Sequence, residues 1–146
     1  METKTKVYDE TLDPNEQLKE AFKLVENSNK LILLVHGGNS CFWCTKLHQK
    51  MESDINIKQF LEENYVVVQI NNGSDKVFDN KYAPNLIAYP WLSVLDKTGK
   101  LLVEQRTGHL EEGSGHNSDR ILTFLKGKKI VGDTKNPQIG EEWKQN

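Results

Sequence analysis

HGGNSCFWCTKLH, residues 36–48, contains both cysteines of the chain, Cys41 and Cys44, spaced as Cys-x-x-Cys. It follows an apolar run, residues 31–35, that is short enough to form one buried strand. After Cys44 the apolar residues recur four apart, as they do on one face of a helix. The cysteines are therefore expected where a strand ends and a helix begins. Unpaired backbone N–H groups and the helix dipole favour a thiolate there, so this placement predicts one reactive sulfur.

The overall composition indicates one soluble, globular domain. The 146 residues are 36% hydrophobic and 27% charged, which suits a single core beneath a charged surface. The net charge is −2 and no basic stripe is present, so nucleic acid is not expected as a partner. No apolar run approaches the roughly 18 residues of a membrane helix, so no membrane insertion is expected. We expect a monomer.

The start of the chain bears on its compartment. METKTK lacks the apolar core of an export signal. We favour the mature region of an exported, periplasmic protein, with the cytoplasm as the alternative. Two cysteines are too few for a disulfide scaffold, and their spacing closes too small a loop to add much stability. A purely structural role for the pair is therefore disfavoured.

Apolar periodicity and turn residues predict the order helix, strand, helix, helix, strand, helix, strand, strand, helix. We expect these elements at residues 14–26, 31–36, 44–52, 53–64, 65–70, 75–82, 91–95, 100–105 and 118–126. The strand at 65–70 has few polar residues, so we expect it to be buried on both faces, central, and parallel to the first strand. The order predicts an α/β fold, a mixed central sheet of four to five strands flanked by helices on both faces.

The chain divides into an N-terminal extension (1–12), a domain (13–127) and a C-terminal tail (128–146). The extension is polar apart from a possible short strand at 6–8. The tail is polar with few apolar anchors, of which Ile130, Val131, Ile139 and Trp143 could dock on the domain. The glycine-rich segment 107–117 is expected to be a loop, with its two histidines, His109 and His116, in solvent.

These features together resemble the thioredoxin superfamily. The Cys-x-x-Cys motif follows the first core strand, and Pro90, after Tyr89, opens the strand before a hairpin, where that family holds a cis-proline. The resemblance covers about residues 13–127 and is strongest to the small bacterial thioredoxin-like, or disulfide-isomerase-like, proteins, whose motif often carries an aromatic before the second cysteine. It implies a thioredoxin-like fold and a thiol–disulfide oxidoreductase, reductase or isomerase. Its partners would be protein or peptide disulfide clients and an upstream thiol reductant or oxidant.

Each residue near the motif has an expected role. Cys41 lies at the exposed turn and should attack a client disulfide, and Cys44, one turn into the helix, should resolve the mixed disulfide. Phe42 and Trp43 are uncharged, which disfavours a strong oxidant; their rings either cover the sulfurs or contact clients. The resemblance implies that Pro90 is cis and that the backbone before it faces the sulfurs and pairs with an extended client segment.

The sequence also departs from thioredoxin itself. Ser40 stands where thioredoxin has a tryptophan, and residues 42–43 replace Gly-Pro. Val35 occupies the position of the buried aspartate that helps move a proton to and from the second cysteine, and residues 67–69 lack the buried lysine. His36 is a candidate to influence the protonation of the cysteine pair, because Val35 cannot.

The sequence is also consistent with two other functions. The two thiolates could carry a soft metal such as Cu(I) without catalysis, or the chain could be an adaptor that binds partners through its aromatic pair. A Cys₂His₂ set completed by His36 and His48 does not have a standard zinc spacing, and His48 is expected on a helix surface. Gly37-Gly38 is not a phosphate loop, since no lysine-serine follows. We expect neither a metal site nor a cofactor.

Overall fold

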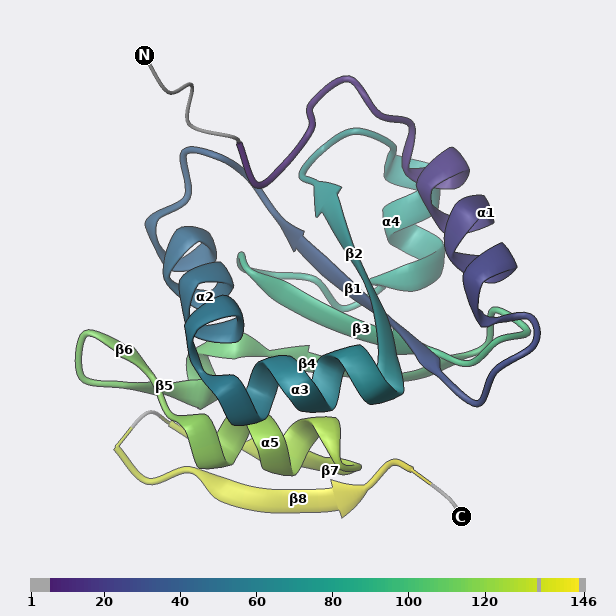
Figure 1. Ribbon diagram of the computed structural model, residues 1–146. Coiled ribbons are helices and arrows are strands. Elements are labelled where there is room, and N and C mark those ends of the chain that lie inside the picture. Colours follow the sequence, from purple (N-terminus) through teal and green to yellow (C-terminus); the bar gives the residue numbers. More distant parts are fainter. Residues whose placement is uncertain (1–5, 134, 145–146) are drawn as a thin grey trace.

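A four-stranded mixed sheet with helices on both faces forms the body of the protein (Figure 1). The computed structural model describes residues 6–133 and 135–144. The strands of the main sheet are β1 (Leu31–Gly37), β2 (Tyr65–Asn71), β3 (Trp91–Leu95) and β4 (Leu101–Arg106). The helices are α1 (Pro14–Val25), α2 (Phe42–Ser53), α3 (Ile55–Asn64), α4 (Lys76–Tyr82) and α5 (Ser118–Leu125). The predicted mixed α/β fold is confirmed.

The strand order is β2-β1-β3-β4, with β2 parallel to β1 and the other two pairs antiparallel. The parallel pairing of β2 was predicted correctly, but its central position was wrong, because β2 is an edge strand. The strand is apolar on both faces because helices cover both faces of the sheet. Val68 and Ile70 pack in the cluster beneath α1 and α4, whereas Tyr65 and Val67 pack in the cluster beneath α3. Two apolar faces of a strand thus indicate that helices cover both faces of the sheet. They do not indicate that the strand has another strand on each side.

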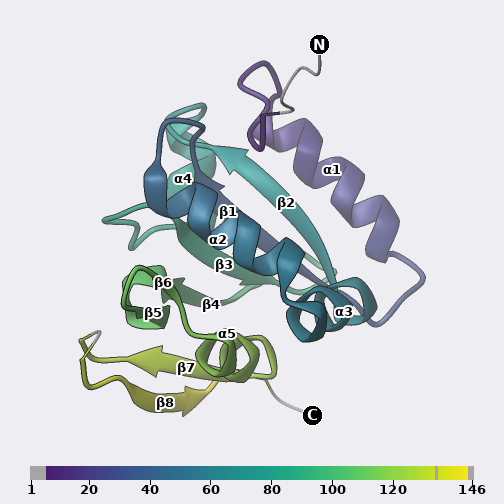
Figure 2. The same cartoon turned by 60° about the vertical axis from the view of Figure 1, so that its left-hand side comes forward.

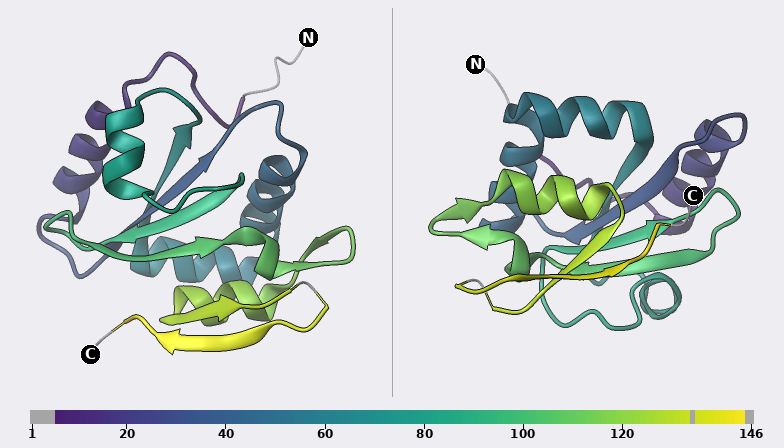
Figure 3. Two further views of the ribbon diagram at one scale, coloured as in Figure 1. Left: turned by 180° about the vertical axis from the view of Figure 1, so that it is seen from behind. Right: turned by 90° about the horizontal axis from the view of Figure 1, so that it is seen from below.

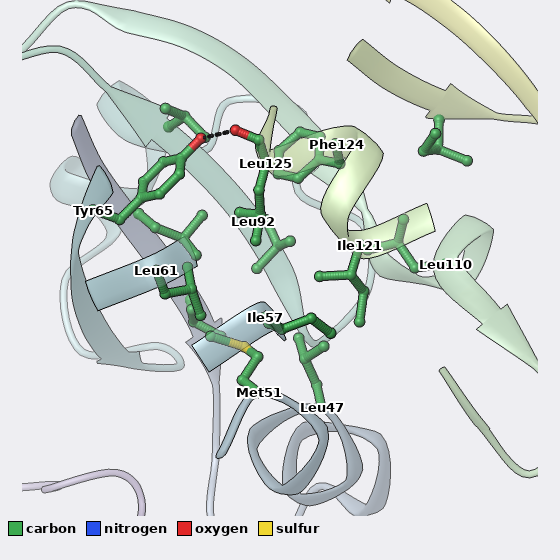
Figure 4. Close-up of a cluster of buried hydrophobic side chains, with 14 residues drawn as sticks. Leu47, Met51, Ile57, Leu61, Tyr65, Leu92, Leu110, Ile121, Phe124 and Leu125 are labelled. Carbon is green, nitrogen blue, oxygen red and sulfur yellow. Dashed lines mark hydrogen bonds between the residues drawn. The ribbon is translucent and has the colours of Figure 1, made fainter. Parts of the chain in front are cut away.

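Two apolar clusters lie on opposite faces of the sheet, because successive side chains of a strand point to opposite sides. Leu33 and Val35 of β1 pack with α2, α3 and α5, while Ile32 and Leu34 pack with α1 and α4. Figure 2 shows α2 in front of the sheet, and the view from behind in Figure 3 shows α4 on the opposite face. Figure 4 shows part of the first cluster, where the Tyr65 hydroxyl donates a 2.6 Å hydrogen bond to the Leu125 carbonyl oxygen. No helix among the described residues is long and apolar enough to cross a bilayer.

Helix starts are capped by short polar side chains, which accept hydrogen bonds from otherwise unpaired N–H groups. Asp13 caps α1, and Asp54 caps α3. Asp54 also accepts a 2.6 Å bond from the Ser118 hydroxyl, which ties the start of α3 to the start of α5. Asn117 caps α5, and its side chain accepts a hydrogen bond from the Arg120 N–H.

The segment after Gly127, predicted as a polar tail, forms an antiparallel hairpin of β7 (Lys128–Val131) and β8 (Gln138–Glu142). Ile130 is buried in the first cluster, and Trp143 packs beside Phe124, whereas Ile139 is exposed. The Gln105 side chain of β4 bonds the N–H and the carbonyl of Ile130, at 2.9 and 2.7 Å. One buried glutamine therefore adds polar anchoring to the packing of Ile130 and Trp143.

The two remaining irregular segments also differ from expectation. Residues 6–8 do not form a strand, yet Tyr8 is 1% exposed. The expected loop 107–117 contains a short turn, η1 (Thr107–Leu110), and a small hairpin of β5 (Glu111–Glu112) and β6 (Gly115–His116). His116 is buried rather than solvated, because this hairpin folds over α2. Residues 1–5 of the extension lie outside the described part.

Candidate active site

The cysteine turn connects β1 to α2 and holds Cys41 at the start of the helix. Cys41 is the N-cap of α2, and its Sγ accepts a 3.2 Å hydrogen bond from the Cys44 N–H. Its own N–H donates to the Gly38 carbonyl at 3.3 Å, which closes the turn. A helix-terminal N–H group and the helix dipole therefore lie where they favour negative charge on this sulfur.

Cys41 and Cys44 form a disulfide with their Cα atoms 5.2 Å apart. The two sulfurs differ in access. Cys41 is partly exposed, whereas Cys44 is 1% exposed and faces β1. A Cβ atom built onto Gly37 would lie only 2.6 Å from Cys44 Sγ, so a glycine is required where this sulfur packs. Of the two sulfur-bearing side chains, only that of Cys41 is therefore accessible from solvent.

The Tyr89–Pro90 peptide bond is cis, which confirms the predicted cis-proline. The strand register places this bond beside the cysteine turn. His36 of β1 pairs with Trp91 of β3, so Pro90, the residue before Trp91, lies opposite Gly37, where the turn begins. The Thr107 hydroxyl, at the start of η1, donates a 2.5 Å hydrogen bond to the Pro90 carbonyl and fixes this segment.

The two aromatic rings of the motif contact each other edge-to-face, with centroids 5.7 Å apart, but they differ in exposure. Phe42 is 63% exposed, with the Lys46 ammonium 5.4 Å from its ring centroid. Trp43 is half-buried and packs edge-to-face against His116 of β6, with ring centroids 5.4 Å apart. Burial, together with the charge of Lys50, lowers the pKa of His116 to about 4, so this ring is neutral near pH 7. Phe42 thus faces solvent, while Trp43 joins the small hairpin to α2.

His36 does not reach the cysteine pair. Its side chain shares the α1 and α4 face of β1 with Leu34, whereas Val35 and Gly37 share the face of Cys44. The His36 ring lies 3.2 Å from the Ser93 hydroxyl, and burial lowers its pKa to about 4. The suggested influence of His36 on the cysteines is therefore not supported by its position. Across residues 6–133 and 135–144, no group of three or more His, Cys, Asp or Glu side chains is arranged to hold a metal.

A family model described as a thioredoxin-like domain matches residues 18–112, which include the cysteine turn and the cis-proline. The chain belongs to the thioredoxin-like family. No curated protein matches the sequence.

Solved structures share the thioredoxin-like fold. The chain is 24% identical to a disulphide isomerase from Xylella fastidiosa Temecula1, with a TM-score of 0.71 over 84% of this chain and 95% of that one. A thioredoxin from Thermus thermophilus is 16% identical, with a TM-score of 0.54 over 74% and 80% of the two chains. A thioredoxin-fold protein from Helicobacter pylori is 18% identical, with a TM-score of 0.50 over 67% and 68%. At these identities the likeness establishes the fold.

Two residues of this thioredoxin-like protein that border the cysteine turn were missed from the sequence. The Tyr8 N–H donates to Asn39 Oδ1 at 2.9 Å, and Asn39 Nδ2 donates to the Tyr8 carbonyl at 2.7 Å. Tyr8 is a lone aromatic in a polar segment, which was a visible signal. Its pairing with a residue 31 positions away was not visible.

Glu104 of β4 is a third residue that the sequence did not single out. Its carboxylate is buried and accepts hydrogen bonds from Trp91 Nε1 at 3.0 Å, from Asn85 Nδ2 at 2.6 Å and from the Asn85 N–H at 3.2 Å. These donors lie on either side of the Tyr89–Pro90 bond. Glu104 therefore braces the cis-proline segment of the thioredoxin-like site.

Proposed function

We propose that this protein is a thiol–disulfide oxidoreductase that reduces or isomerises protein disulfides through Cys41 and Cys44. The thioredoxin-like fold with a Cys-x-x-Cys pair supports this chemistry in general. The observation that carries the proposal is the asymmetry of the two sulfurs: Cys41 caps α2 and is accessible, whereas Cys44 is buried beside it.

In the reduced protein, the Cys41 thiolate attacks one sulfur of a client disulfide. A mixed disulfide forms, and the other client sulfur leaves as a thiolate that takes a proton from water. Cys44 then loses its proton and attacks Cys41 Sγ, which closes the intramolecular disulfide and releases the second client thiolate. Two electrons pass from the dithiol to the client, and the client gains two protons. In isomerisation, a client thiol attacks the mixed disulfide instead, and the dithiol is recovered.

Reduction or isomerisation is favoured over net oxidation. A strong oxidant needs its reduced form stabilised, which a charged residue between the cysteines achieves. Phe42 and Trp43 carry no charge, and the helix-terminal N–H group is the direct partner of Cys41 Sγ. The exposed Phe42 ring and the partly exposed Tyr89, beside the cis bond, offer apolar contacts to an extended client.

Paired single-cysteine variants test the proposal. The reduced wild type should reduce insulin disulfides with dithiothreitol as electron source, and Cys41→Ser should abolish this activity. Cys44→Ser retains the attacking sulfur but lacks the resolving one, so it should accumulate a mixed disulfide with the client on non-reducing gels. Full turnover by Cys41→Ser, or a mixed disulfide formed by Cys41→Ser and not by Cys44→Ser, would overturn the assignment.

A further inference from the structure

The hydroxyl of Tyr8 lies buried beside the resolving sulfur. A Cβ atom built onto Gly37 would lie 2.5 Å from Tyr8 Oη and 2.6 Å from Cys44 Sγ. The hydroxyl oxygen and the sulfur therefore both lie close to the same position beside Gly37. The distance between these two atoms cannot exceed the sum of the two distances. Tyr8 is 1% exposed, and its hydroxyl has no hydrogen-bond partner among the described residues.

An unpaired buried hydroxyl is costly, because it gives up its hydrogen bonds to water without replacement. The position of Tyr8 is nevertheless well fixed. The Asn39 side chain holds both the N–H and the carbonyl of Tyr8, and Asn39 belongs to the cysteine turn itself. These two hydrogen bonds attach the N-terminal segment to the cysteine turn and place the Tyr8 ring beside Cys44 Sγ. An unpaired Tyr8 hydroxyl that costs free energy beside Cys44 Sγ suggests a role in the reduced protein, in which the Cys41–Cys44 disulfide is open.

We propose that Tyr8 is a hydrogen-bond donor to Cys44 in the reduced protein, a role that rests on the proposed redox function of the pair. In the disulfide, Cys44 Sγ is fixed by its bond to Cys41. When that bond is reduced, Cys44 gains a proton or a negative charge and its side chain can rotate. The sulfur then becomes a better acceptor, and the Tyr8 O–H gains the partner that it lacks in the oxidised protein.

The phenol acts as a donor and not as a base. Burial raises the pKa of Tyr8 above its ordinary value, so the hydroxyl keeps its proton near neutral pH. Val35, on the same face of β1 as Gly37, is apolar and offers no proton to Cys44. Tyr8 reaches the resolving cysteine from the N-terminal segment instead. Its hydrogen bond favours the Cys44 thiolate during the resolving attack, and it stabilises the dithiol over the disulfide at equilibrium.

The prediction is a shift in redox equilibrium when the hydroxyl is removed. Tyr8→Phe deletes one oxygen atom and keeps the ring that packs against Gly37. In glutathione buffers at pH 7, we expect the equilibrium constant of the Cys41–Cys44 pair to move about tenfold toward the disulfide. For this two-electron couple, that change lowers the reduction potential by about 30 mV. The free energy of unfolding of oxidised Tyr8→Phe should stay equal to or exceed that of the wild type, because the hydroxyl has no partner in that state.

Tyr65→Phe is a matched control, because it also removes a buried tyrosine hydroxyl. Tyr65 Oη is bonded to Leu125, and Tyr65 begins β2, at the end of the sheet away from the cysteine turn. Tyr65→Phe should therefore lower stability and leave the reduction potential unchanged. A Tyr8→Phe potential equal to that of the wild type, or a shift in the opposite direction, would overturn the proposal. These measurements use glutathione alone, so failure of the wild type to reduce insulin would count against the proposed client activity and not against the role of Tyr8.

Discussion

Acidification should destabilise the fold through His36 before most carboxylates titrate. His36 is buried in β1, and its pKa falls from an ordinary 6.5 to about 4 on folding. The unfolded chain therefore binds a proton at His36 first as the pH falls below 6.5. The free energy of unfolding is therefore unaffected by His36 above pH 6.5. It falls as the pH drops from 6.5 to 4, and His36 changes it no further below pH 4.

The size of this effect follows from the two pKa values. One pKa unit corresponds to about 1.4 kcal/mol, so a fall from pH 7.5 to pH 5.0 should cost about 2 kcal/mol at His36 alone. His116, whose pKa is also lowered to about 4, adds a cost of the same sign. The wild type should lose the sum of both contributions.

Urea unfolding of the oxidised protein at pH 7.5 and 5.0 measures this loss directly. His36→Gln removes the titrating ring and keeps a neutral polar group near the Ser93 hydroxyl. Its loss between the two pH values should be smaller than that of the wild type by about 2 kcal/mol. His48→Gln, on the partly exposed surface of α2, is the control and should retain the wild-type difference. Carboxylates shared by all three proteins cancel in the comparison. Equal losses in the wild type and His36→Gln would refute the assignment of this pH dependence to His36.

Two substitutions test the packing around the redox turn. Gly37→Ala places a Cβ against Tyr8 Oη and Cys44 Sγ, so overpacking should cost about 1–3 kcal/mol and lower the Tm in calorimetry; an unchanged Tm would show that the contact is not tight. Glu104→Gln retains one acceptor oxygen for three N–H donors, one of them Trp91 Nε1. It should cost about 1–3 kcal/mol in urea unfolding and slow insulin reduction, and wild-type values of both would argue against its bracing role.

Local patterns predicted most of the secondary structure correctly. The apolar run after residue 30 and the helical spacing after Cys44 placed the cysteines at a strand-to-helix junction, where the structure has them. These features depend on residues close together in the chain. The cis form of the Tyr89–Pro90 bond was accessible through family resemblance alone, because sequence composition does not distinguish cis from trans.

The errors concern contacts between distant residues. The two apolar faces of β2 were interpreted as the mark of a central strand, but an edge strand covered by helices on both faces has the same pattern. The hairpin formed by β7 and β8 is held by Gln105 as well as by Ile130 and Trp143, and no hydrophobic pattern selects this polar residue. Tyr8 likewise lies beside Cys44 because Asn39 holds its backbone. Such polar pairings leave little trace in periodicity, so the supports of the site were harder to predict than the cysteines.

The reduction potential of the Cys41–Cys44 couple, measured in glutathione buffers, tests the redox function most directly. We predict that the pair equilibrates as a two-electron couple with a potential at or below about −180 mV, in the range of disulfide isomerases and thioredoxin. The uncharged Phe42 and Trp43 are the reason for this value. A potential near −120 mV would identify a strong oxidant and contradict the predicted direction. Failure of the pair to exchange with glutathione would contradict the redox role itself.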